Sequence, residues 1–184
     1  MLSDILQRGG RATRRSALWL ALPVGLMACS PALDWRQVQP PGWSLVAALP
    51  CRPDTAERPV PLAGAPVLLM LWSCSVDGHL YAIASAELAD PTRVGPALQA
   101  LAAAASANLA APAEPGLAAS VPGMTPHAAA RQLQLAGRRP DGQPLRAEVL
   151  VFAYGTRVYQ ATVLGPQASP ALARPLFDAL QVRR

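Results

Sequence analysis

The feature that most constrains the fold is an Asp-Gly pair between two apolar segments. The run "VLLMLWSCS" (67–75) is continuously apolar, and "LYAIASAEL" (80–88) follows it after the four residues "VDGH" (76–79). Asp-Gly favours the two-residue turn of a β-hairpin, because that turn needs positive φ at both of its central positions. We therefore predict an antiparallel hairpin here, and a sheet whose neighbouring strands are joined by short turns.

Further strands are expected on both sides of this hairpin. Leu133 and Leu135 alternate with glutamines, which is the period of a half-buried strand. In "TRVYQATVLG" (156–165) both alternating sets contain apolar residues, so we expect both faces of that strand to be partly covered. The complete set comprises a first strand at 35–38, then 43–51, a short edge strand near Val60, 67–75, 80–88, 131–136, 145–155 and 156–165.

Two segments have the period of an amphipathic helix instead. The first runs from about Pro96 to Ala110, and the second begins at Ser169-Pro170, a pair suited to a helix start. Their apolar stripes are Val94, Leu98, Leu101, Ala105 and Leu109 in the first, and Leu172, Leu176, Phe177 and Leu180 in the second. The order of elements predicts an α+β fold, a mainly antiparallel sheet with two helices packed on it as an α/β sandwich.

The N-terminal segment has the pattern of a secretory signal. Residues 16–28 carry no charge, and four arginines (Arg8, Arg11, Arg14 and Arg15) precede them. Thirteen uncharged residues are too few for a helix that crosses a bilayer, which needs about 20. A basic segment followed by a short apolar one is typical of a cleaved leader, so residues 1–28 are predicted to be a signal peptide.

The end of this segment, Leu26-Met27-Ala28-Cys29, resembles the lipobox of bacterial lipoproteins. The resemblance implies that the Cys29 thiol receives a diacylglyceryl group, that cleavage occurs before Cys29 and that acyl chains such as palmitate anchor the protein to a membrane. An ordinary signal cleavage near Ala28 or Ala32 is the alternative. Arg14-Arg15 also resembles a twin-arginine signal, so the export route stays open.

These features predict the organisation and location of the protein. Residues 1–28 would be a lipoprotein signal peptide, 29–42 a lipidated tether, and 43–184 a single α+β domain. The expected location is the cell envelope, on the periplasmic face of a membrane. Ser30, where an aspartate would favour retention at the inner membrane, favours the outer membrane.

If Cys29 carries lipid, the two remaining cysteines form an even pair. Disulfides form in oxidising compartments such as the periplasm, so we predict a Cys51–Cys74 bond. Two buried thiols are the alternative. A zinc site is not expected, because two cysteines so far apart and without paired histidines do not provide its ligands.

A weaker resemblance concerns the domain as a whole. The "PDG" turn (140–142), the "GTRVYQATV" strand (155–163) and a last helix that contains Phe177 are similar to small PsbP-like export domains and to bacterial lipoproteins of unknown function. The resemblance covers most of residues 43–182 and implies a small α+β domain. It supplies no catalytic residues.

Charge excludes one class of partner. The chain has 16 arginines, no lysine and 11 acidic residues, of which four arginines and one aspartate precede Cys29. The part from Cys29 onward therefore has a net charge of +2. A basic stripe for nucleic acid is absent from the sequence, so no nucleic-acid partner is expected.

No catalytic motif is present, so we predict no enzyme activity, no cofactor and no metal. His79 is interpreted as a solvated residue of the hairpin. The candidate binding residues are His127 at the end of the 111–127 loop, Arg131 after it, and the pair Arg138-Arg139 before "PDG".

Two functional hypotheses follow. The first is a non-catalytic module, anchored to a membrane by its lipid, that binds or supports another envelope component. The second is a small-ligand-binding or hydrolytic periplasmic domain with a site near the 111–127 loop. Convergence of His127, Arg131 and an acidic residue in one cleft would favour the second hypothesis.

Overall fold

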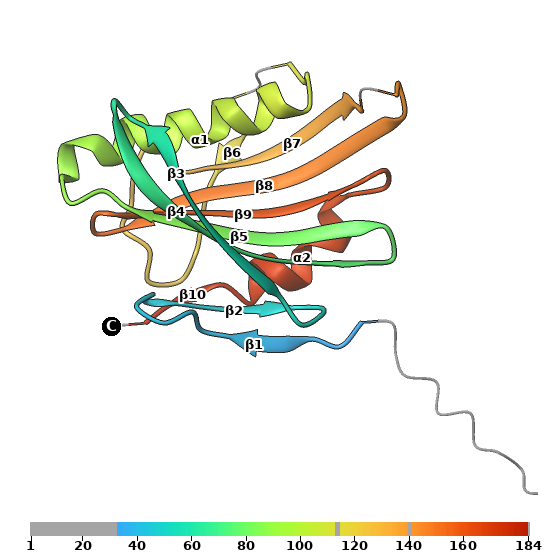
Figure 1. The fold of residues 1–184 in the computed structure, drawn as a ribbon, viewed down its shortest axis with the longest axis horizontal. Coiled ribbons are helices and arrows are strands. Elements are labelled where there is room, and N and C mark those ends of the chain that lie inside the picture. The colour runs from blue at the N-terminus through green and yellow to red at the C-terminus, as the bar shows by residue number, and fades with distance from the viewer. Residues whose placement is uncertain (1–32, 113–114, 140, 184) are drawn as a thin grey trace, which may run out of the picture. The chain divides into compact units, whose positions relative to one another are not determined.

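A large antiparallel sheet forms the centre of the domain (Figure 1). The computed structural model describes residues 33–112, 115–139 and 141–183. The sheet has seven strands in the order β3-β4-β5-β9-β8-β7-β6, and all neighbouring pairs are antiparallel. The strands are β3 (Asp54–Leu62), β4 (Ala65–Val76), β5 (His79–Glu87), β6 (Leu117–Ala118), β7 (Arg131–Arg138), β8 (Pro144–Tyr154) and β9 (Arg157–Gly165).

The predicted hairpin is confirmed as the β4–β5 pair. Its turn residues Asp77 and Gly78 have φ values of 50° and 73°, the positive values that the expected turn requires. Val76 is paired with His79 directly next to the turn. Local turn chemistry therefore sets the register of the two strands.

A second, smaller sheet combines segments from both ends of the domain. It contains β1 (Arg36–Val38), β2 (Leu45–Leu49) and β10 (Gln181–Val182), in the order β1-β2-β10 and again antiparallel. The segment expected to be a tether thus contributes β1 to the folded domain. Two-residue β10 was not expected, because so short a strand has no detectable period.

The two helices lie on opposite faces of the large sheet. The helix α1 (Val94–Asn108), preceded by the short 3-10 helix η1 (Pro91–Arg93), approaches Gly137 of β7 through Leu109. The helix α2 (Pro170–Asp178) faces the neighbouring positions Gln134 and Ala136 of β7. Since successive residues of a strand point to opposite faces, α1 and α2 cover different sides.

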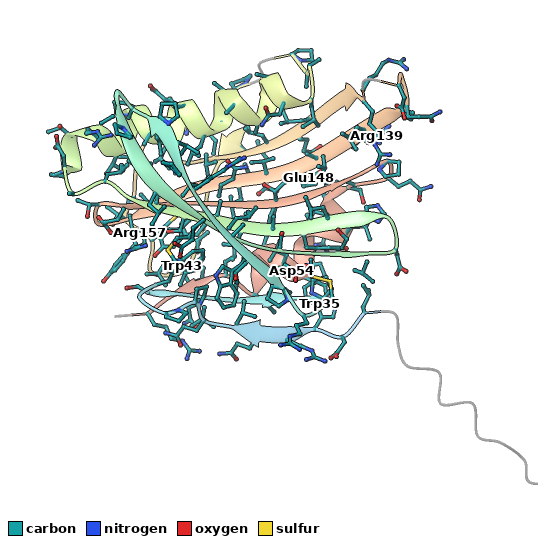
Figure 2. All side chains as sticks on the ribbon, in the orientation of Figure 1. Trp35, Trp43, Asp54, Arg139, Glu148 and Arg157 are labelled. Atoms are coloured by element: carbon teal, nitrogen blue, oxygen red, sulfur yellow. A yellow bond between two sulfur atoms is a disulfide. The ribbon has the colours of Figure 1, made fainter. Side chains whose placement is uncertain are left out.

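Aromatic side chains fill the space between the large sheet and the small one. Phe152 stacks on Tyr159 with ring centroids 5.1 Å apart, and Trp43 meets Tyr159 edge-on at 5.9 Å. Trp35 makes a similar edge contact with Tyr81 at 6.1 Å. Figure 2 shows Trp35 and Trp43 between the small sheet and the strands above it. These tryptophans therefore belong to the core and its border.

The α+β class, with a mainly antiparallel sheet and two helices, is confirmed. The main difference concerns β3, which has nine residues where only a short strand near Val60 was expected. It pairs with β4 along its whole length, from Asp54↔Ser73 to Leu62↔Ala65. Pro59 and Pro61 fit this position because β3 is an edge strand, whose outer side needs no donors.

The predicted disulfide joins Cys51 to Cys74, whose Cα atoms are 5.9 Å apart. It connects the chain just after β2 to β4 and so links the small sheet to the large one. In the part of the chain that the structure describes, no helix combines the length and apolar character needed to cross a membrane. Cys29 and the predicted signal peptide lie outside the described residues.

Candidate functional site

Two of the candidate residues meet at one shallow cavity. His127 and Arg131 line a hollow of about 340 Å³ together with Gln99 of α1. His127 is exposed, and its Nδ1 accepts a hydrogen bond from the N–H of Ala129 at 3.0 Å. Arg131 donates through Nη1 to the carbonyl of Ala130 at 2.9 Å.

This cavity lacks the acidic group that the ligand-binding or hydrolytic hypothesis requires. Among the described residues, the lining consists of alanines besides Gln99, His127 and Arg131. The Nδ1 atom of His127 already binds its own loop, and no carboxylate orients the imidazole. The convergence that would favour the second hypothesis is therefore not found there.

The arginine pair lies elsewhere, at the turn between β7 and β8. Arg138 donates through Nη1 to the carbonyl of Gly142 at 3.0 Å, so it stabilises its own turn. Arg139 borders a different hollow, shared with Ser75 and His79. The four candidate residues are thus divided between two places and do not form one site.

The interpretation of His79 as a solvated residue is wrong. His79 begins β5 and is 9% exposed, because its ring packs against Gly165 of β9. Its Nδ1 lies 2.8 Å from the carbonyl of Asp77. The other ring nitrogen, Nε2, has no hydrogen-bond partner in the described part of the chain, so neighbouring Ser75 is not activated by it.

The most distinctive polar group lies on β8 instead. Glu148 is only 3% exposed, and its Oε2 atom has no hydrogen-bond partner among the described residues. Figure 2 labels this side chain on the large sheet. Buried carboxylates are costly unless paired, so an unpartnered one calls for a physical explanation.

Glu148 lines a cavity of about 350 Å³, which we call the α2 groove. One side is formed by β7 and β8, through Gln134, Ala136, Arg146 and Glu148. The other is the start of α2, through Ser169 and Pro170. Burial raises the pKa of Glu148 from 4.5 to about 7, so the carboxyl group changes charge near neutral pH.

The start of α2 adds its own polar groups to the groove. Ser169 has the extended backbone of a helix cap, as its position before Pro170 predicts, but its side chain makes no capping hydrogen bond. The N–H groups in the first turn of a helix have no partner within the helix. They give this end of the groove a partial positive charge.

Glu148 was not among the residues predicted from the sequence, although one signal was present. It is the only charged residue in "AEVLVFA" (147–153), an otherwise apolar stretch of β8. A charge in such a run predicts either a bulge or a buried polar site. The sequence does not show that β7 and α2 lie next to Glu148, because those contacts join segments that are distant in sequence.

No protein-family model matches the chain, and comparisons with curated proteins and with solved structures find no match either. The resemblances to lipoproteins and to PsbP-like domains therefore stay predictions. Within the described residues, no group of three or more His, Cys, Asp or Glu side chains is arranged to hold a metal ion.

Proposed function

We propose that this protein is a lipid-anchored envelope lipoprotein whose globular domain is non-catalytic and binds or supports another envelope component. In this proposal Cys29 carries the lipid after removal of residues 1–28. The domain then faces the periplasm, attached most favourably to the outer membrane.

The observation that carries the proposal is the Cys51–Cys74 disulfide. Structural disulfides belong to oxidising compartments such as the bacterial periplasm. The bond uses two of the three cysteines, which leaves Cys29 at the end of the apolar leader as the one available for lipid. Two or more acyl chains are needed for stable anchoring, since each buried CH₂ contributes about 0.8 kcal/mol.

The contacts of the histidine and arginine side chains in the described residues bear on the hydrolytic alternative. His79 and Ser75 are not joined by a hydrogen bond, and His127 has no carboxylate partner in its cavity. Arg138 donates a hydrogen bond within its own turn. These side chains are held by structural contacts, so they do not favour the hydrolytic alternative.

The anchor is tested by metabolic labelling with radioactive palmitate in cells. The wild-type chain is expected to incorporate label, and the variant Cys29→Ala to incorporate none and to retain its leader. Cys51→Ala/Cys74→Ala is the matched control, because it also removes cysteines but leaves the lipobox intact. Equal labelling of the wild type and Cys29→Ala would contradict the proposal.

The partner is sought separately, because no residue pattern identifies it. Crosslinking in cells followed by affinity purification should recover a defined envelope component with the wild-type protein. The Cys29→Ala variant, which lacks the lipid anchor, should recover much less of it. If neither chain captures an envelope protein above background, the supporting role is wrong even if the anchor is present.

A further inference from the structure

The α2 groove contains a charge that the protein itself does not neutralise. Glu148 is 97% buried and borders the groove, and its buried Oε2 atom has no hydrogen-bond partner in the described part of the chain. A group of this kind is costly to the folded protein unless something else meets it. A ligand with a hydrogen-bond donor would do so.

A second charge lies close to the first. Arg146 and Glu148 are two residues apart on β8, so they point to the same face, with Cα atoms about 7 Å apart at the rise of a strand. Both line the groove, but neither is part of an ion pair among the described residues. Arg146 is exposed and available to a ligand.

The start of α2 adds to the positive electrostatic potential at one end of the groove. Pro170 has no N–H and the N–H of Ala173 donates to the carbonyl of Ser169 at 3.0 Å, so the N–H groups of Ala171 and Leu172 are left without a partner inside the helix. The helix dipole favours negative charge at this end, where Ser169 and Pro170 line the groove. One end of the groove thus suits an anionic group, whereas Glu148 suits a cationic one.

We propose that the α2 groove binds a small zwitterion of amino-acid or dipeptide size. Its ammonium group would donate to Glu148, and its carboxylate would meet Arg146 and the first turn of α2. A simple anion would be repelled by Glu148, and a simple cation would be repelled by Arg146. A metal ion would find only one carboxylate there.

The proposal includes a dependence on pH. Burial raises the pKa of Glu148 to about 7, so the free protein holds the carboxyl proton in mildly acidic solution. Binding of an ammonium group requires the carboxylate, so that proton must leave. Among the described residues, Arg146 is the only other ionisable side chain that lines the groove. Affinity should therefore rise between pH 5 and pH 7, a range in which the ammonium group of the ligand stays protonated.

The test is an NMR titration of the purified full-length protein with the dipeptide Ala-Ala. Two matched probes each lack one charge: Ala-Ala amide lacks the carboxylate, and N-acetyl-Ala-Ala lacks the ammonium. Ala-Ala should produce saturable shifts of the backbone amides of Glu148 and Ser169 and bind at least tenfold more tightly than either probe. Absence of saturable shifts for all three would overturn the proposal.

Variants then assign the two charges. Glu148→Gln should weaken binding of Ala-Ala at least tenfold and remove its pH dependence, and Arg146→Gln should weaken Ala-Ala and N-acetyl-Ala-Ala but not the amide. Arg139→Gln, which changes an arginine outside the groove, should bind like the wild type. Circular dichroism confirms that each variant is folded. Unchanged binding by folded Glu148→Gln would contradict the inference. This test does not depend on the lipid anchor proposed above.

Discussion

At the end of α1, a backbone carbonyl occupies the space that most side chains would need at position 137. A Cβ atom on Gly137 would lie 1.8 Å from the carbonyl oxygen of Leu109 and 2.8 Å from its carbonyl carbon. The same oxygen accepts a hydrogen bond from the N–H of Arg138 at 3.3 Å. Glycine is therefore required for α1 to reach β7.

The variant Gly137→Ala should lose at least about 2 kcal/mol of unfolding free energy, because α1 or β7 must move to relieve the clash. Gly95→Ala is the matched control. A Cβ there meets only the His127 ring, at 3.0 Å, and that exposed side chain can turn away. Urea denaturation of both variants measures the difference. Equal stabilities would show that the contact does not restrain the helix.

Glu148 should make stability depend on pH. Its folded pKa is about 7 and its ordinary value is 4.5. Below pH 4.5 the carboxyl is protonated in both states, so burial of the charge costs nothing. As pH rises from 4.5 to 7, only the unfolded state ionises freely, and the folded protein loses stability on the order of 2–3 kcal/mol.

The neutral variant Glu148→Gln should lack this loss. Its stability relative to the wild type should therefore increase between pH 4.5 and pH 7 and then stay constant. Urea denaturation at several pH values measures the difference between the two proteins. A constant difference across that range would mean that the carboxyl group is not desolvated in the folded state.

Among the elements, those bordered by strong turns could be predicted from the sequence. The strand expected at 67–75 is β4 (Ala65–Val76), and that expected at 80–88 is β5 (His79–Glu87), because Asp77-Gly78 fixes the reversal between them. The pairing of β5 with β9 could not be predicted. It brings Ile83 next to Ala161, and nothing in the local period of either strand specifies a partner so distant in sequence.

The candidate site could be predicted even less well. Histidines and arginines were chosen because their side chains often bind ligands, yet His127 and Arg138 are engaged by their own loops. The groove depends on Glu148, Arg146 and Ser169 coming together from β8 and the start of α2. Its parts are visible in the sequence, but their proximity is a tertiary property.

The disulfide stabilises the connection between the two sheets. It closes a loop with a sequence separation of 23, which on the chain-entropy estimate contributes about 3 kcal/mol. The double variant Cys51→Ala/Cys74→Ala should lose about that much unfolding free energy. Dithiothreitol should destabilise the wild type by a similar amount and leave the double variant unchanged. Equal sensitivity of both proteins to the reductant would contradict this prediction.

On the scale of the whole domain, β10 holds three distant segments together. Gln181 and Val182 pair with Val46 and Leu45 of β2. The N–H of Val182 also donates to the carbonyl of Pro122 at 2.9 Å, and that of Arg183 donates to Ser44 at 2.7 Å. The last strand thereby connects the small sheet to the loop that follows β6.

Truncation after Leu180 should therefore loosen regions far from residue 180 in sequence. Hydrogen exchange should become faster in residues 45–49 and 121–124, because both lose backbone hydrogen bonds, while the β8–β9 pair stays protected. Gln181→Ala, which removes an exposed side chain but keeps the backbone, should exchange like the wild type. Faster exchange across the entire large sheet would show that β10 is needed for the fold as a whole.

The position of β2 between β1 and β10 also determines the order in which the strands of the small sheet can pair. A chain that emerges N-terminus first, from a ribosome or through a membrane pore, presents β2 long before β10 exists to pair with it. During that interval one edge of β2 is open to other chains. A chaperone that binds nascent chains would have its greatest effect during this interval. It would no longer be needed once β10 has paired with β2.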